Sequence, residues 1–109
     1  MSELAPRSIV SVYAVFADAA EAERISRIIV EERLAACANL LGSCQSIYRW
    51  QGKIETGDET AAIFKARADK AEALVARIAA LHSYDVPAIS VWPIEKAHPP
   101  YADWVNEEG

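Results

Sequence analysis

His82, where the second predicted helix of this 109-residue chain ends, is a candidate metal ligand. A neutral imidazole is a common metal ligand, and Asp85, three positions later, could orient the ring or bind the same ion. The alternative is structural, because a histidine at the end of a helix complements the helix dipole. Spacing alone favours the structural interpretation, since no second histidine is near in sequence and His98 lies in a proline-flanked loop.

The chain has two cysteines, Cys37 and Cys44. A Cys37 thiolate could act as a ligand or a nucleophile, whereas a cysteine within Leu-Ala-Ala-Cys-Ala is more often a small buried apolar residue. Seven positions apart in one extended segment, the two side chains are expected to point to opposite faces and not to pair. Unpaired thiols are typical of a reducing compartment, so we expect a cytoplasmic protein.

Three aromatic residues, Tyr48, Trp50 and Tyr84, could line a pocket together with the cation of Lys65. The alternative is that these rings fill the core or a subunit interface. The sequence contains no Cys-x-x-Cys, His-Glu-x-x-His or calcium-loop spacing, and no glycine-rich phosphate loop or Gly-x-Ser-x-Gly elbow. The residues therefore favour a protein that is not an enzyme.

Composition narrows the class of partner. A chain with 52% hydrophobic and 25% charged residues is typical of a globular protein, and its length predicts one domain over residues 1–109. The net charge is −5 and the basic residues are scattered, which argues against nucleic acid. Residues 1–7 are polar, unlike a secretory signal, and no apolar run approaches the ~20 residues of a membrane span. We expect neither a nucleic-acid nor a membrane partner.

Residues 8–16 are nearly all apolar, which predicts a central strand covered on both faces. A helix is expected from Asp18 to about residue 33, with Asp18 as its cap and Glu21 completing an Asp-x-x-Glu box. The same Asp-x-x-Glu pattern at Asp69 and Glu72 predicts a second helix that ends near residue 82.

The segment between these helices predicts a long hairpin. One strand is expected over residues 34–50 and another over residues 53–67, with the turn at Gln51-Gly52. Gly42-Ser43 indicates a bulge in the first strand, and residues 56–58 suggest a second irregularity opposite or close to it. Tyr48 and Trp50 should face one side of the hairpin, and Ile47 and Arg49 the other.

Residues 88–94 predict a fourth strand, whose end at Pro93 either lies at an edge or leaves the sheet. A short helix carrying Tyr101, Trp104 and Val105 follows. The order β-α-β-β-α-β plus a helix predicts a ferredoxin-like α+β sandwich, with both long helices on one face of a four-stranded antiparallel sheet. Little is left to cover the other face. A partly uncovered apolar face predicts oligomerisation.

Residues 32–39, 46–55 and 81–87 closely resemble the CutA divalent-cation tolerance family. Tyr101 with Trp104 resembles the family's C-terminal aromatic pair, so the resemblance spans nearly the whole chain. It implies a ferredoxin-like fold assembled as a tight homotrimer, with strands adding across subunits, as in the trimeric nitrogen-signalling PII proteins. It also implies a role in tolerance to divalent metals, with copper binding in some members.

Carried over by position, the resemblance implies that His82 is a metal ligand. It places six residues in a cleft between subunits: Cys37, Tyr48, Trp50, Lys65, Tyr84 and Asp85. The chain departs from the family in three places. It has no cysteine near residues 14–15, it has Ser and Asp in the usual His-Pro-Tyr-Glu run, and residues 95–98 lack the usual glycine.

Our leading hypothesis is a cytoplasmic homotrimer that binds copper or another divalent cation weakly through His82. An alternative is a PII-like signalling or adaptor trimer that binds a small anionic ligand in the inter-subunit cleft through Lys65 and the aromatic residues. An enzyme using Cys37 as its nucleophile is the third hypothesis and has the least support.

Overall fold

A computed structural model of the protein describes residues 7–109. Its elements are β1 (Ile9–Phe16), α1 (Ala19–Glu31), β2 (Cys37–Trp50), β3 (Lys53–Arg67), a 3₁₀ turn (Ala68–Lys70), α2 (Ala71–Leu81), β4 (Ile89–Pro93) and α3 (Pro99–Glu108). Residues 1–6, on which the expectation about a signal sequence mainly rests, lie outside the described part. Within residues 7–109, no helix is long and apolar enough to cross a membrane.

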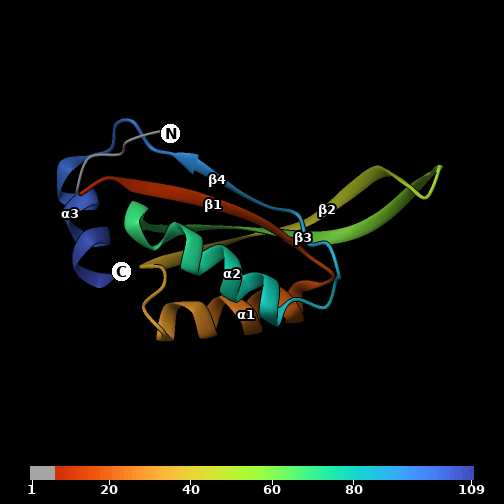
Figure 1. The fold of residues 1–109 in the computed structure, drawn as a ribbon, viewed down its shortest axis with the longest axis horizontal. Coiled ribbons are helices and arrows are strands. Elements are labelled where there is room, and N and C mark those ends of the chain that lie inside the picture. Colours follow the sequence, from red (N-terminus) through yellow and green to blue (C-terminus); the bar gives the residue numbers. More distant parts are fainter. Residues whose placement is uncertain (1–6) are drawn as a thin grey trace.

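The four strands form one antiparallel sheet in the order β2-β3-β1-β4, and α1 and α2 pack side by side on one of its faces (Figure 1). This arrangement confirms the ferredoxin-like α+β fold. β1 lies between β3 and β4 and is buried along its length apart from half-buried Tyr13, as its apolar sequence predicts. The largest core side chains lie between this sheet and the two helices: Phe16, Ile25, Ile29, Phe64, Leu74 and Ile78.

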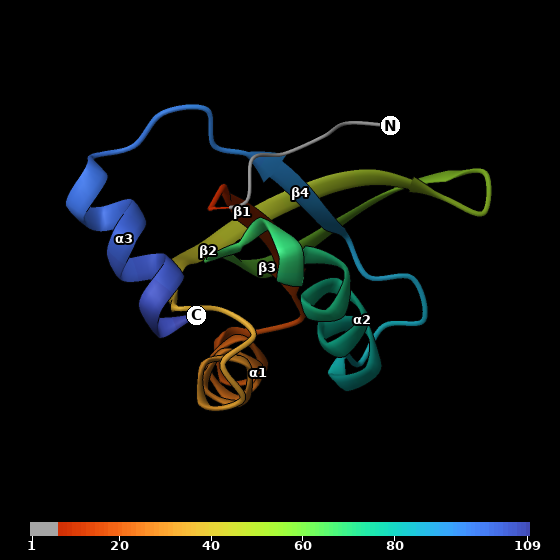
Figure 2. The same cartoon turned by 60° about the vertical axis from the view of Figure 1, so that its left-hand side comes forward.

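The second face of the sheet is covered only in part. Figure 2 shows α3 standing at one end of the sheet, where Val105 packs against Ile9 and Ala36. Elsewhere the ends of β2 and β3 extend beyond the helices as a two-stranded arm (Figure 1). Large apolar side chains remain exposed along the sheet and this arm: Leu40, Leu41, Ile47, Tyr48, Trp50, Ile54, Val91 and Trp92.

The predicted bulge is present in β2. Leu40 lies opposite Ala62 and Gly42 opposite Ala61, so Leu41 is the extra residue. Gly42 has a φ of +93°, a left-handed value that glycine adopts without a steric cost. The bulge lets β2 continue to Trp50 with its alternation shifted by one position.

This shift overturns the expectation that the two cysteines face opposite sides. Cys37 lies opposite Lys65 and Cys44 opposite Glu59, and these β3 partners, an even number of residues apart, share one face. Both thiols are free. The partner positions are roughly 20 Å apart along the strand, which is too far for a disulfide.

Two other details of the hairpin differ from expectation. Residues 34–36 are not part of β2, because α1 ends at Glu31 and Arg33 then turns the chain with a φ of +59°. The ladder also runs without a break through residues 56–58, so the second irregularity is absent. The predicted turn is confirmed: Gln51 and Gly52 both have positive φ, +51° and +81°, as a type I′ turn requires.

The two predicted helix caps have different outcomes. Asp18 caps α1, because its Oδ1 accepts the backbone N–H of Glu21 at 2.8 Å. Asp69 does not cap α2. It lies in the 3₁₀ turn before the helix, and its carboxylate instead accepts two hydrogen bonds from Arg67 at 2.9 and 2.6 Å.

Candidate functional site

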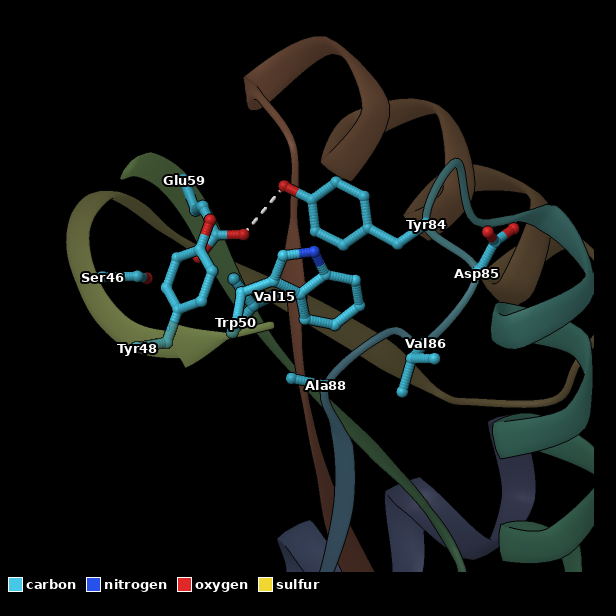
Figure 3. Close-up of a pocket in the computed structure, with 9 residues that line it drawn as sticks. All are labelled: Val15, Ser46, Tyr48, Trp50, Glu59, Tyr84, Asp85, Val86 and Ala88. Atoms are coloured by element: carbon cyan, nitrogen blue, oxygen red, sulfur yellow. Dashed lines mark hydrogen bonds between the residues drawn. The ribbon is translucent and has the colours of Figure 1, made fainter. Parts of the chain in front are cut away.

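A hollow of about 520 Å³ opens where the base of the β2–β3 arm meets the loop between α2 and β4 (Figure 3). β1 forms one wall of the hollow at Val15, whose backbone N–H donates to the carbonyl of Ala88 at 3.2 Å. Side chains from three strands and the loop line it: Val15, Ser46, Tyr48, Trp50, Glu59, Tyr84, Asp85, Val86 and Ala88.

Strand alternation brings the β2 and β3 residues of the hollow together. After the bulge, Cys44 lies opposite Glu59, and Tyr48 and Trp50 follow on the same face at intervals of two. Glu59 therefore projects from β3 toward the side on which both rings stand (Figure 3). Sequence reasoning missed Glu59 because the irregularity expected at residues 56–58 obscured the hairpin register that identifies it.

Tyr84 closes the hollow from the loop side. Its hydroxyl donates a hydrogen bond of 2.8 Å to Glu59 Oε2 (Figure 3). Burial and the neighbouring Glu59 carboxylate raise the pKa of Tyr84 to about 12. The phenol is therefore protonated at neutral pH and remains a donor, which holds the loop against β3.

His82 lies behind the hollow, at the C-terminal end of α2, and only 9% of the residue is exposed. Its ring stacks on Phe16 with centroids 5.1 Å apart. Nδ1 accepts the backbone N–H of Tyr84 at 3.0 Å, so the proton lies on Nε2, which donates to the carbonyl of Val15 at 2.7 Å. Both nitrogens are thus engaged within the chain, and a metal could reach Nδ1 only by replacing Tyr84 N–H.

Glu21 is a second anchor of the same loop, and the sequence did not indicate this role. One carboxylate oxygen accepts the N–H of Ala17 and the other the N–H of Ser83, both at 2.9 Å. The expected capping box is therefore modified, since its glutamate binds Ala17 rather than Asp18. Burial acts to raise the pKa of Glu21. These hydrogen bonds and the nearby His82 outweigh burial, so the pKa lies below its ordinary 4.5.

The structure brings together four of the six predicted cleft residues: Tyr48, Trp50, Tyr84 and Asp85. Asp85 lies at the rim with its carboxylate turned away from the rings (Figure 3). Cys37 and Lys65 do not line this hollow. They lie opposite each other nearer α3, where Cys37 Sγ is 3.6 Å from the hydroxyl of Tyr101.

The described residues of one chain do not by themselves form a complete metal site. Across residues 7–109, no group of three or more His, Cys, Asp and Glu side chains is placed to hold an ion. His82 and Asp85, the pair expected from the sequence, lie on either side of Tyr84 in the loop. The metal role of His82 stays a prediction.

Comparison with known proteins identifies the family. Residues 10–108 match the family model described as CutA1 divalent ion tolerance protein. The divalent-cation tolerance protein CutA of Pyrococcus horikoshii is 42% identical over 100 residues, covering 92% of this chain and 97% of that protein. Protein CutA of mouse is 35% identical over 102 residues, which cover 94% of this chain but only 58% of the mouse protein.

A solved structure agrees with these matches. The crystal structure of CutA1 from Oryza sativa superimposes with a TM-score of 0.90 at 32% identity, covering 93% of both chains. This chain matches the family over nearly its whole length, and it has the strand order, the bulged hairpin and the loop after α2. The protein belongs to the CutA1 divalent ion tolerance family.

Proposed function

We propose that this chain acts in divalent-cation tolerance as a homotrimer that binds copper or another divalent cation weakly, and that it is not an enzyme. The observation that carries the self-association is the arm. On the face of the arm that points away from the hollow, Ile47 and Ile54 stand 69% and 60% exposed. A two-stranded hairpin with such exposed apolar side chains is stabilised by packing that face against another surface.

The free edge of β2 supports the same assembly. β2 is an outer strand of the sheet and runs for 14 residues, so its outward backbone groups have no partner strand within the sheet. Such an edge pairs readily with a strand from another chain. A second and third copy would supply both the strand and the cover for the Ile47 and Ile54 face of the arm, in the assembly that the family resemblance implies.

We place the metal at His82, in a site that is completed by another copy. Nδ1 carries a lone pair in the tautomer described, and Asp85, exposed on the same loop, offers a carboxylate. Binding has to displace Tyr84 N–H from Nδ1, so part of the coordination energy is offset by a lost hydrogen bond. This competition is the reason that we propose weak binding.

The alternative of a small anionic ligand receives less support from the hollow. Among its nine lining residues, Glu59 and Asp85 are acidic and none is basic. Lys65, the cation expected to hold the anion, lies elsewhere on the sheet. An anion would therefore meet a negative surface in this hollow.

Calorimetric titration of the metal-free protein with copper and zinc tests the metal proposal. We expect saturable binding to the wild type, weakened about tenfold or more by His82→Gln and by Asp85→Asn. Asp103→Asn, an exposed acidic residue on α3, is the matched control and should bind as the wild type does. Thermal unfolding of each variant checks that the fold is retained. Absence of binding to the wild type, or equal binding to His82→Gln, would overturn the metal site.

A further inference from the structure

The three aromatic rings of the hollow form part of a cage, and the carboxylate of Glu59 lies beside them. Tyr48, Trp50 and Tyr84 gather around the space above Val15, and all three remain substantially exposed (Figure 3). Aromatic faces carry negative electrostatic potential. Three such rings in one concave site attract a cation whose surface is weakly hydrated.

Glu59 supplies the balancing charge. Its Oε2 is held by the hydroxyl of Tyr84, whereas within residues 7–109 its Oε1 receives no hydrogen bond and no basic side chain forms an ion pair with it. The residue is half-buried beside the rings. A carboxylate that has no cationic partner within the described residues can pair with the charge of a bound cation.

We propose that the hollow binds a small organic cation of the quaternary or alkylated ammonium class, with its alkyl groups against Tyr48, Trp50 and Tyr84 and its charge beside Glu59. A hydrated divalent ion fits this lining less well, because such ions need several oxygen or nitrogen ligands, whereas the ring faces present carbon and the Asp85 carboxylate is turned away from them (Figure 3). The volume of about 520 Å³ falls within the range of small-molecule sites. The inference does not depend on metal binding at His82.

Choline and its neutral isostere dimethylbutanol, in which carbon replaces the ammonium nitrogen, provide the test. The 109-residue chain is titrated with each compound in chelator-containing buffer, and the indole N–H signal of Trp50 is followed by NMR. We expect choline to bind about tenfold more tightly than the isostere. Because the buffer contains no free metal, a failure of the metal proposal leaves this result unaffected.

Three variants locate the site. Trp50→Leu and Glu59→Gln should each weaken choline binding about tenfold, while Asp58→Asn should not. Asp58 is the matched control, because it is the neighbour of Glu59 on β3 and faces the opposite side of the hairpin. Circular dichroism confirms the fold of each variant. Equal affinity for choline and dimethylbutanol, an equal loss in Asp58→Asn, or no binding by the wild type would overturn the proposal.

Discussion

The carboxylate of Glu21 on α1 accepts the backbone N–H of Ser83 at 2.9 Å, across 62 positions of sequence. One residue earlier, the buried ring of His82 bonds to β1 through Val15 and to the loop through Tyr84 N–H. Two side chains from the core therefore fix the start of the loop that carries the rim of the hollow. The position of Tyr84 over Glu59 depends on both.

Replacing Glu21 with glutamine should destabilise the protein at neutral pH by about 1–2 kcal/mol, because one of two hydrogen bonds to a charged acceptor is lost. The pKa of Glu21 in the folded protein lies below its ordinary 4.5, so its stabilising contribution is complete above that pH. The contribution is lost as pH falls through the folded-state pKa. Urea unfolding should therefore give wild type and Glu21→Gln stabilities that differ at neutral pH and converge in acid.

Glu23 provides the control for this prediction. It lies on the exposed face of α1 and makes only a surface ion pair with Arg27 at 3.0 Å. Glu23→Gln should change the free energy of unfolding by no more than about 0.5 kcal/mol at neutral pH. An effect as large as that of Glu21→Gln would mean that helix charge, rather than the bond to Ser83, determines the result.

Tyr84 should ionise at about pH 12, two pH units above an ordinary tyrosine. Because the folded-state pKa is raised, the associated stability is complete below pH 10 and is lost as pH rises toward 12. Subtracting the ultraviolet titration of Tyr84→Phe from that of the wild type isolates this phenol from Tyr101, whose pKa is also raised to about 12.

Glu59→Gln should shift the Tyr84 titration toward pH 10, since the variant removes the charge that opposes phenolate formation. The shift should be incomplete, because burial of the phenol persists. An unchanged titration in Glu59→Gln would show that the 2.8 Å contact does not form in solution.

Two glycines of the hairpin should respond differently to alanine. Gly52 has a φ of +81°, so Gly52→Ala should cost about 1 kcal/mol through backbone strain, although no atom lies within 4 Å of the added Cβ. Gly57 is not in the left-handed region, and its added Cβ would meet only the Tyr48 hydroxyl, at 3.8 Å. Gly57→Ala should change stability by less than about 0.5 kcal/mol, as measured by thermal unfolding. Equal losses would contradict the type I′ turn.

Local chemistry made most of the fold predictable. The Asp18 cap, the Gln51-Gly52 turn and the bulge at Gly42 each depend on residues close in sequence, and all three occur. Asp69 failed as a cap because Arg67, two residues away, binds its carboxylate, and sequence spacing does not rank such competing partners. Cys37 and Cys44 share a face because the bulge shifts the alternation of β2. The position of the bulge in the ladder depends on how β2 pairs with β3.

The candidate site was less predictable because its contacts join distant segments. Alternation placed Tyr48 and Trp50 on one face, the aromatic side chain of Tyr84 made it a third candidate for the pocket, and the family resemblance added Asp85 to the cleft. Glu59 and Val15 join the hollow only once β3 and β1 are paired in register, and Glu21 reaches Ser83 only when α1 packs beside α2. Conversely, Cys37 and Lys65 share a sheet face with the rings but lie too far along it to line the hollow.

Sedimentation equilibrium tests most directly the claim that other copies of the chain cover the Ile47 and Ile54 face of the arm. We predict a stable species of three times the 11.9 kDa chain mass at micromolar concentration. An Ile47→Asp and Ile54→Asp double variant, which charges one face of the arm, should shift the population toward smaller species while its circular dichroism is retained. A wild type that sediments as a monomer at micromolar concentration would contradict the proposed homotrimer.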